Sequence, residues 1–297
     1  MRILVTLLLA VLIAPFARAE AAESAGDNHL LTIAVCPPWK KGEDAKQTAL
    51  MGGACKTTVG AIEASFQNDM GVAKDKSYSL LNDGATYADV TAKFAWLNEN
   101  TGADDTLYIY LLAHGGHLQG HYKGYPVTDQ GIAFWSEKEP DLSVATDEKI
   151  FMLVRTFRDM MDSVKVKNIV LIVDSCHSGA SFNDFKNDPH AQSASAARTA
   201  IVMSAKGDQF ANFNADYTMP LFSEMLSHSL KVSAGQPLSD AVELADTAAH
   251  RRLRVNCATP AVKKMLKEAN DLSYYSLCTQ RAEVYDPTGL MDEITVE

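Results

Sequence analysis

Short apolar runs alternate with longer amphipathic stretches along most of the chain. The runs predict β-strands over residues 30–35, 78–81, 107–112, 169–173, 199–203 and 281–285. Those at 107–112 and 169–173 are almost continuously apolar, which is typical of parallel strands buried on both faces of a sheet. The pattern therefore predicts a sheet whose central strands are parallel.

Apolar residues at helical spacing fill the stretches between these runs. They predict helices over residues 59–70, 87–97, 146–162, 218–232, 238–254 and 261–269. Thr259 and Pro260 suit the cap and the first turn of the last helix. The succession of strands and helices predicts an α/β fold with a mostly parallel central sheet flanked by helices.

The amino-terminal segment has the layout of a secretory signal peptide. Arg2 precedes an apolar run over 3–14, and the small residues Ala17 and Ala19 follow. The run is shorter than the roughly 20 apolar residues that a membrane-spanning helix needs. We expect residues 1–19 to be removed before Glu20, leaving a secreted or periplasmic protein with no membrane anchor.

Composition limits which classes of protein the full-length chain can belong to. Its 297 residues, 47% of them hydrophobic, suffice for one large domain or two small ones. The formal charge of -10 becomes -12 when Arg2 and Arg18 are lost with the signal peptide. A chain this acidic lacks the cationic surface that nucleic acid or an anionic membrane requires, so neither is expected as a partner.

An odd number of cysteines leaves at least one without an intrachain partner in an oxidising compartment. The simplest pairing joins Cys36 to Cys55 and Cys257 to Cys278, although the sequence allows other pairings. Cys176 stands apart in the middle of the chain. It is therefore the expected free thiol.

Two short polar segments follow the two buried strands. Residues 114–116 are His-Gly-Gly, and residues 174–179 are Asp-Ser-Cys-His-Ser-Gly. Parallel strands bind ligands at their carboxyl ends, so neighbouring strands here would bring His114 and Cys176 to one crevice. A thiolate attacks carbonyl carbon and an imidazole moves the proton, which together suffice for acyl transfer. The glycines, including Gly179, allow close approach of substrate backbone, and the amides of Gly115 and Cys176 are candidate oxyanion donors.

These motifs, 62 positions apart, resemble the metacaspase branch of the caspase-like cysteine peptidases. The resemblance covers roughly residues 30–250 and includes the segment before His114 and the region around Gln209. It implies a caspase-like fold over 30–254, with residues 20–29 as an amino-terminal lead and 255–297 as a disulfide-stapled extension. It also implies an endopeptidase with Cys176 as nucleophile and His114 as general acid and base.

The resemblance further implies that Asp174 lines a pocket for Arg or Lys before the scissile bond, through charge-assisted hydrogen bonds. Two positions depart from the family pattern. Cys55 is followed by Lys56 rather than by an acidic pocket residue, and Lys56 would repel a basic substrate. Leu112 replaces the serine that usually lies two residues before the histidine. If Cys55 occupies the family's pocket position, its pairing with Cys36 is also in question.

Two segments near the motifs are candidates for a calcium site and for an activation site. Members of the family often bind activating calcium, and an acidic cluster over 137–148 is a candidate site, although it also suits a solvated helix start. The loop over 181–198, with Lys186 and Arg198, is either an activation site or an ordinary surface loop. No organic cofactor is expected.

Three other functions stay open. A legumain-like peptidase of the same clan would cut after Asn, and a non-catalytic caspase-like module would only bind peptide. A metallohydrolase would use His114, His117, His121 and Cys176 as zinc ligands. The glycines among these histidines disfavour a helix that would make the ligands converge, so His117, His121 and His177 are interpreted as loop or rim residues. The primary prediction is an exported cysteine endopeptidase whose partner is a peptide or protein substrate.

Overall fold

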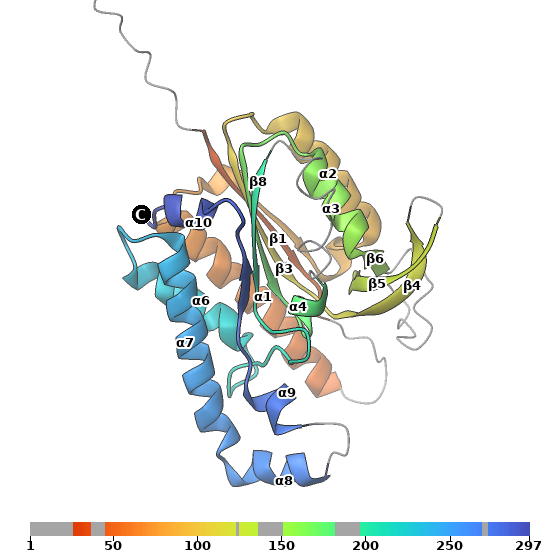
Figure 1. Cartoon of the computed structure of the whole chain (residues 1–297), viewed down its shortest axis with the longest axis vertical. Helices are drawn as coiled ribbons and strands as arrows, with labels where there is room; N and C mark the ends of the chain where they lie inside the picture. Colours follow the sequence, from red (N-terminus) through yellow and green to blue (C-terminus); the bar gives the residue numbers. More distant parts are fainter. Residues whose placement is uncertain (1–25, 37–44, 123–124, 136–150, 182–196, 269–272) are drawn as a thin grey trace, which may run out of the picture.

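A mixed α/β architecture surrounds one large sheet. The computed structural model describes residues 26–36, 45–122, 125–135, 151–181, 197–268 and 273–297. Within them, six strands form a sheet in the order β2-β1-β3-β7-β8-β9 (Figure 1). The first five strands are parallel and β9 is antiparallel to β8. The strands are β1 (Asn28–Ala34), β2 (Ser77–Leu81), β3 (Thr106–Leu112), β7 (Asn168–Asp174), β8 (Arg198–Met203) and β9 (Glu283–Tyr285).

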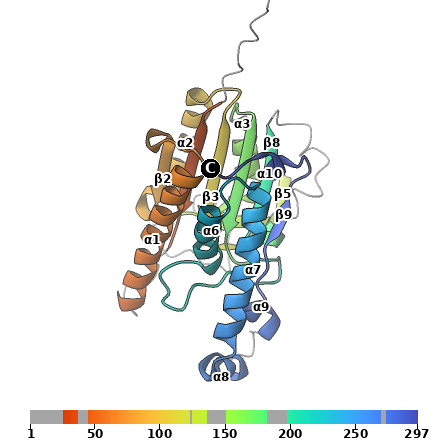
Figure 2. The ribbon, with the colours of Figure 1, turned by 90° about the vertical axis from the view of Figure 1, so that its left-hand side faces the viewer.

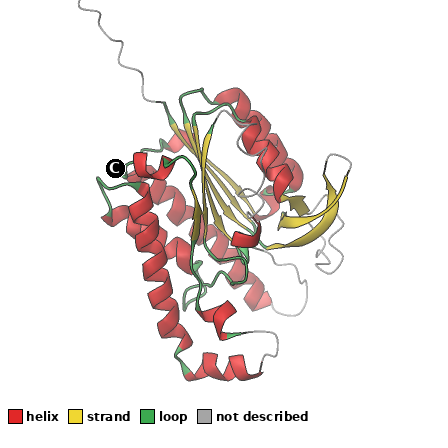
Figure 3. Ribbon diagram, viewed as in Figure 1, coloured by secondary structure: helices red, strands yellow, loops and turns green. Residues whose placement is uncertain are grey.

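Helices cover both faces of this sheet (Figures 2 and 3). One face packs on α1 (Ala45–Asp69), α6 (Leu221–Val232) and α7 (Leu238–Cys257), and the other on α2 (Tyr87–Asn100) and α3 (Val154–Ser163). Alternate residues of each strand enter opposite layers. In β3, Tyr110 joins the α1–α6–α7 core, whereas Ile109 and Leu111 join the α2–α3 core. The predicted α/β fold with a mostly parallel central sheet is confirmed.

A second sheet was not predicted. Strands β4 (Gly115–Tyr122), β5 (Tyr125–Ala133) and β6 (Phe151–Leu153) form an antiparallel unit beside the end of β3. Glycines and histidines interrupt apolar alternation in β4, so the segment carries no clear strand pattern. The helix expected from residue 146 begins only at Val154, because residues 151–153 pair with β5 instead.

The carboxyl-terminal segment completes the fold. The helix expected from residue 218 begins at Leu221, after Asn214 Oδ1 has accepted the amide of Thr218 in a turn. Beyond α7 lie α8 (Pro260–Glu268), α9 (Tyr274–Cys278) and α10 (Leu290–Glu293), of which only α8 was predicted. Residues 255–297, expected as an extension, supply β9 to the central sheet and Val296 to its core.

Two disulfides join the predicted cysteine pairs. Cys36 bonds to Cys55 and Cys257 bonds to Cys278, which leaves Cys176 as a free thiol. Both pairs and the free thiol are therefore confirmed. In the part of the chain that the structure describes, no helix is both long and apolar enough to cross a bilayer. The predicted signal peptide, residues 1–19, lies outside the described residues, as do residues 20–25 of the lead.

Removing the second disulfide should destabilise the fold. Cys257→Ser with Cys278→Ser opens a loop with a sequence separation of 21, which corresponds to about 3 kcal/mol of unfolding free energy. We expect a drop in Tm of roughly 6–12 °C in a thermal melt followed by circular dichroism. Cys176→Ser, which breaks no disulfide, is the matched control. An equal Tm for the double variant and the control would contradict the expectation.

Candidate active site

The candidate site lies where β3 and β7 end side by side. The two strands pair in parallel, and the last pair joins Leu112 to Asp174. His114 and Cys176 each follow two residues later, so the 62-residue spacing of the motifs equals the register of the strands. Both residues line one pocket. The prediction that they face one crevice is confirmed, while their chemical roles stay predictions.

Three strand ends and one loop build this pocket, which measures about 50 Å³. Its walls come from the end of β1, the end of β3, the turn after β7 and the loop that precedes α6. Cys36 is one lining residue, so the Cys36–Cys55 disulfide forms part of the wall. Lys56 is exposed on α1 and is not among the lining residues. Its neighbour Cys55 is bonded to the lining residue Cys36, so the expectation that Lys56 repels a basic substrate stays a prediction.

The turn that carries Cys176 is fixed by the loop after β8. His177 adopts a left-handed conformation (φ 57°), which is costly for a residue with a side chain. Its amide donates to Gln209 O at 2.9 Å, and its Nδ1 lies 2.9 Å from Gly207 O. Ser178 Oγ donates to Ala205 O and accepts the Ala205 amide. These bonds hold Cys176 at the pocket despite the strain.

Gly179 serves internal packing rather than substrate approach. Its amide donates to Ala205 O at 2.9 Å, and a Cβ at this position would lie 2.8 Å from the Gly207 amide nitrogen. A side chain would therefore push the turn away from the loop after β8. The expectation that Gly179 makes room for substrate backbone is corrected accordingly.

Desolvation shifts the pKa of each candidate catalytic group toward its neutral form. Loss of water around Cys176 raises the pKa of its thiol, and the negative charge of Asp174 raises this pKa further. The thiol donates to Ala211 O, with sulfur and oxygen 3.8 Å apart. Burial also lowers the pKa of His114, although part of the ring faces solvent. Both shifts favour the uncharged forms, a thiol and a neutral imidazole in one pocket, and a neutral imidazole is chemically able to accept a proton.

Two backbone amides near the turn that carries Cys176 are available as hydrogen-bond donors to a ligand. Gly115 lies opposite Ile132, and the adjacent hydrogen bond runs from the Ala133 amide to His114 O. In this register the amide of Gly115 points away from β5. The amide of Cys176 donates to no group in the described chain. Both are compatible with the predicted oxyanion role, although Gly115 is not among the pocket-lining residues.

Asp174 is a buried carboxyl group at the base of the pocket. It is 1% exposed, and burial raises its pKa. Its Oδ2 accepts a hydrogen bond of 2.5 Å from Ser223 Oγ, which lies 2.6 Å from the hydroxyl of Tyr110. Its Oδ1 makes no hydrogen bond of good geometry to the described residues, although the Ser204 hydroxyl and the Ser223 amide lie close enough to oppose the rise of the Asp174 pKa. A buried, unpartnered acceptor that lines a pocket is suited to a ligand that donates a hydrogen bond.

Two buried glutamines support the loop between β8 and α6 (residues 204–220), which we call the pocket loop, and this supporting role was not predicted. Gln280 Oε1 accepts the Asn212 amide at 2.8 Å, and its Nε2 donates to Ser204 O at 2.9 Å. Gln209 donates to Thr279 O and accepts the Arg281 amide. These glutamines are nearly fully buried and lie about 70 positions apart. No local sequence pattern marks such residues, because each glutamine side chain bonds to backbone groups that are distant in the sequence.

Metal binding has little support among the described side chains. The one His, Cys, Asp and Glu cluster found there is Asp27, His29 and Asp105, at the amino ends of β1 and β3. His29 Nε2 lies 2.8 Å from Asp105 Oδ2, and Lys76 pairs with Asp27, which indicates a polar clamp. His117 and His121 lie in β4 rather than in a loop, and their side chains are outside the described set. The 137–148 acidic cluster and Lys186 also lie outside it.

Comparison with known proteins concerns the fold alone. No family model matches the chain, and no curated protein matches it. Among solved structures, it is similar to protein GSU0716 from Geobacter sulfurreducens, with a TM-score of 0.53 and 15% sequence identity. The match covers 91% of this chain and 99% of the other. At this identity the similarity supports the mixed α/β architecture.

The raised pKa of Asp174 predicts a pH-dependent stability difference. The native state binds this proton more tightly than the unfolded chain does, so ionisation opposes folding as pH rises above the ordinary carboxyl range. Asp174→Asn removes this effect. Its Tm relative to wild type should increase by a few degrees from about pH 4 to about pH 8. Asp208→Asn, at an exposed position, is the control. A difference that falls with pH would contradict the account.

Proposed function

We propose that the protein is a cysteine endopeptidase with a caspase-like fold and the metacaspase type of site. The observation that carries the proposal is the shared register of β3 and β7, which brings His114 and Cys176 into one pocket. Supporting it are the free thiol, the tightly held nucleophile turn and the buried Asp174. The mostly parallel sheet with helices on both faces agrees with this fold.

The proposed reaction is acyl transfer in two steps. His114 takes the thiol proton while the sulfur of Cys176 forms a bond to the peptide carbonyl carbon. The carbonyl oxygen gains the negative charge, which amides of Cys176 and Gly115 stabilise. The C–N bond then breaks, and His114 returns the proton to the leaving amine. Water, deprotonated by His114, hydrolyses the thioester and restores the thiol.

Asp174 is proposed to select the residue before the scissile bond. An Arg or Lys side chain would supply the donor that Oδ1 lacks, and its charge would favour the ionised carboxylate. Asp174 lines the pocket but is only 1% exposed, so this binding mode requires the pocket to open around the carboxyl group. Phe213 and Pro220 also line the pocket and belong to the loop between β8 and α6.

A second candidate specificity follows from the same two observations. The burial and the raised pKa of Asp174 suit an uncharged side chain with a hydrogen-bond donor, such as the carboxamide of Asn. This would be the legumain-like activity. Basic substrates nevertheless remain the primary proposal. Oδ1 of Asp174 is buried in the pocket that Cys176 also lines, and a cationic side chain would compensate the charge of the ionised Asp174 carboxylate.

Fluorogenic peptides that end in Arg, Lys, Asn or Asp test the proposal. Mature protein should cleave the Arg and Lys peptides, and Cys176→Ala should abolish turnover. His114→Ala should lower kcat by about 10²- to 10⁴-fold, because general acid and base catalysis is lost. His228→Ala, an exposed histidine on α6, is the matched control.

Each part of the proposal has its own contrary result. Cleavage after Asn alone would transfer the assignment to the legumain-like candidate. Turnover that survives in Cys176→Ala would exclude the proposed nucleophile. A folded protein that cleaves none of the four peptides, with calcium present or absent, would favour a non-catalytic peptide-binding module.

A further inference from the structure

The end of α7 and the whole of α8 carry a concentration of positive charge. Residues 251–267 contain six Lys and Arg residues and no Asp or Glu, although Asp and Glu outnumber Lys and Arg by 37 to 27 in the chain. We call this segment the cationic tip. Its cations are Arg251, Arg252 and Arg254 on α7 and Lys263, Lys264 and Lys267 on α8.

The cationic tip extends away from the central sheet. α7 continues past the sheet toward the lower end of the molecule, and α8 turns across that end (Figures 1 and 2). All six cationic side chains are exposed. In the part of the chain that the structure describes, only Lys264 among them forms an ion pair, with Glu268 at 3.8 Å. The positive charge of the tip is therefore presented to solvent.

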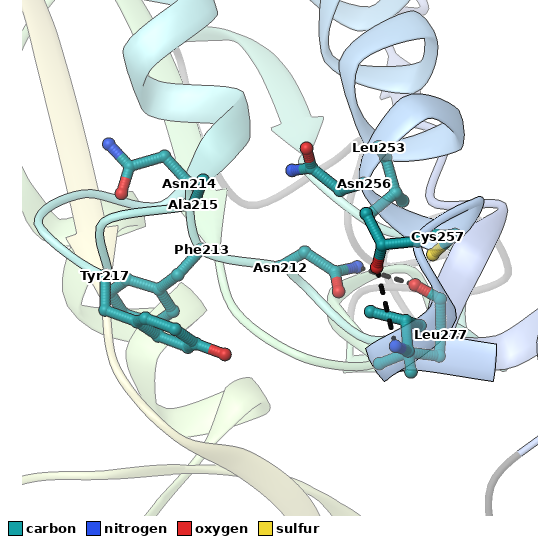
Figure 4. Close-up of a pocket in the computed structure, with 11 residues that line it drawn as sticks. Asn212, Phe213, Asn214, Ala215, Tyr217, Leu253, Asn256, Cys257 and Leu277 are labelled. Atoms are coloured by element: carbon teal, nitrogen blue, oxygen red, sulfur yellow. Dashed lines mark hydrogen bonds between the residues drawn. The ribbon is translucent and has the colours of Figure 1, made fainter. Parts of the chain in front are cut away.

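On α7 the arginines lie on the face that points away from the rest of the protein. Leu253 and Cys257 are buried, and with Asn256 they line a pocket of about 310 Å³ against the pocket loop (Figure 4). Because an α-helix turns by about 100° per residue, Arg251 and Val255 lie on the side of α7 opposite Leu253. Val255 is 66% exposed, so this face has an apolar centre surrounded by arginines.

The helix dipole explains only part of this arrangement. Cations in the last turn of a helix interact favourably with its dipole, which explains Arg254 in α7. Lys263 lies instead in the first turn of α8, where a positive charge is unfavourable, and that turn contains no acidic residue. Lys263 and Lys267 are four residues apart on α8, so their like charges repel each other. The cluster therefore destabilises α8, and an anionic partner would offset this effect.

Exposed aromatic and apolar side chains near the cations indicate a bilayer surface as the partner. Tyr274 and Tyr275 begin α9 and are 53% and 49% exposed, and the Cys257–Cys278 disulfide holds α9 to the end of α7. Tyrosine rings are enriched at the headgroup level of bilayers, and cations beside apolar residues are typical of surfaces that bind anionic lipid. The phosphates of a nucleic acid would contact the cations but would give Val255 no apolar partner.

Total charge and local charge lead to different expectations for this chain. The net charge of -10 predicts that an anionic membrane is not a partner. Exposed charges more than about 10 Å apart are largely screened at 0.1 M salt, so a membrane responds to the side chains that face it. The two disulfides are compatible with an extracellular protein, which meets membrane surfaces. The tip can therefore contact an anionic bilayer while the acidic remainder of the chain stays in solution.

We infer that the cationic tip docks the protein on anionic phospholipid bilayers. Arg251, Arg254 and Lys263 bind lipid phosphates, and Val255 enters the headgroup region between the arginines. The attachment is mainly electrostatic, so it weakens as the salt concentration rises. It needs no peptidase activity and does not depend on the proposed function.

Flotation of mature protein with lipid vesicles tests the docking. One set of vesicles is phosphatidylcholine alone, and the other contains about 30% phosphatidylglycerol, which is anionic. We expect a partition coefficient at least about tenfold higher for the anionic vesicles at low salt, because each Lys or Arg at an anionic surface adds favourable free energy. Salt at about 0.5 M should reduce this coefficient by at least about tenfold, because it screens the charges.

Two variants of equal net charge identify the binding surface. Arg251→Glu with Lys263→Glu reverses two charges of the tip and should lower the partition coefficient by at least about tenfold. The matched control is Lys74→Glu with Lys165→Glu, two exposed lysines that precede β2 and β7. Its coefficient should stay within about twofold of wild type, because these charges do not face the bilayer.

A milder variant covers the case in which the reversed charges lower the Tm. Arg251→Gln with Lys263→Gln removes the two charges without reversing them. It should lower the partition coefficient by at least about fivefold.

The contrary outcomes identify other partners. Equal partition into the two kinds of vesicle, or equal loss of binding in the tip and control variants, would overturn the docking. Wild type that binds a labelled DNA duplex but no vesicle would assign the tip to nucleic acid. A dimer that only the tip variant dissociates in light scattering, without vesicle binding, would assign it to a second copy. Selective loss of vesicle binding in the tip variant supports the docking whether or not any peptide is cleaved.

Discussion

The in-register pairing of β3 with β7 determines where the candidate catalytic groups lie. Each residue of β3 is opposite the residue 62 positions later in β7, and this offset continues past the last pair to His114 and Cys176. Both strands are buried on both faces, so a slip of one residue would place apolar side chains against the wrong helical layer. Core packing thereby maintains the geometry of the site.

The turn after β7 depends in addition on long-range polar contacts. His177 and Ser178 bond to the loop after β8, and Gln280 bonds to that loop from the carboxyl-terminal segment. The left-handed backbone at His177 costs free energy of order 1 kcal/mol, which these bonds offset. Strand β9 and its neighbours are consequently part of the site's support, although they lie beyond the motifs.

The sequence predicted those parts of the fold that local patterns encode. Apolar runs located the main-sheet strands, and the two motifs located His114, Cys176 and Asp174. It missed β4, whose glycines and histidines break the alternation, and it placed a helix start in the segment that forms β6. The supporting contacts of Ser223 and Gln280 were also missed, because their partners are 49 and 68 or more positions away. Such contacts exist only in the folded chain.

The proposed chemistry depends on a thiol whose pKa is raised and an imidazole whose pKa is lowered. The direct test is labelling with a peptidyl acyloxymethyl ketone that carries Arg next to the ketone, followed by mass spectrometry. Attack by the sulfur displaces the carboxylate and leaves a thioether. The account predicts one adduct per chain, on Cys176, formed at least about tenfold more slowly in His114→Ala. Absence of an adduct on Cys176, or equal rates in the two proteins, would contradict it.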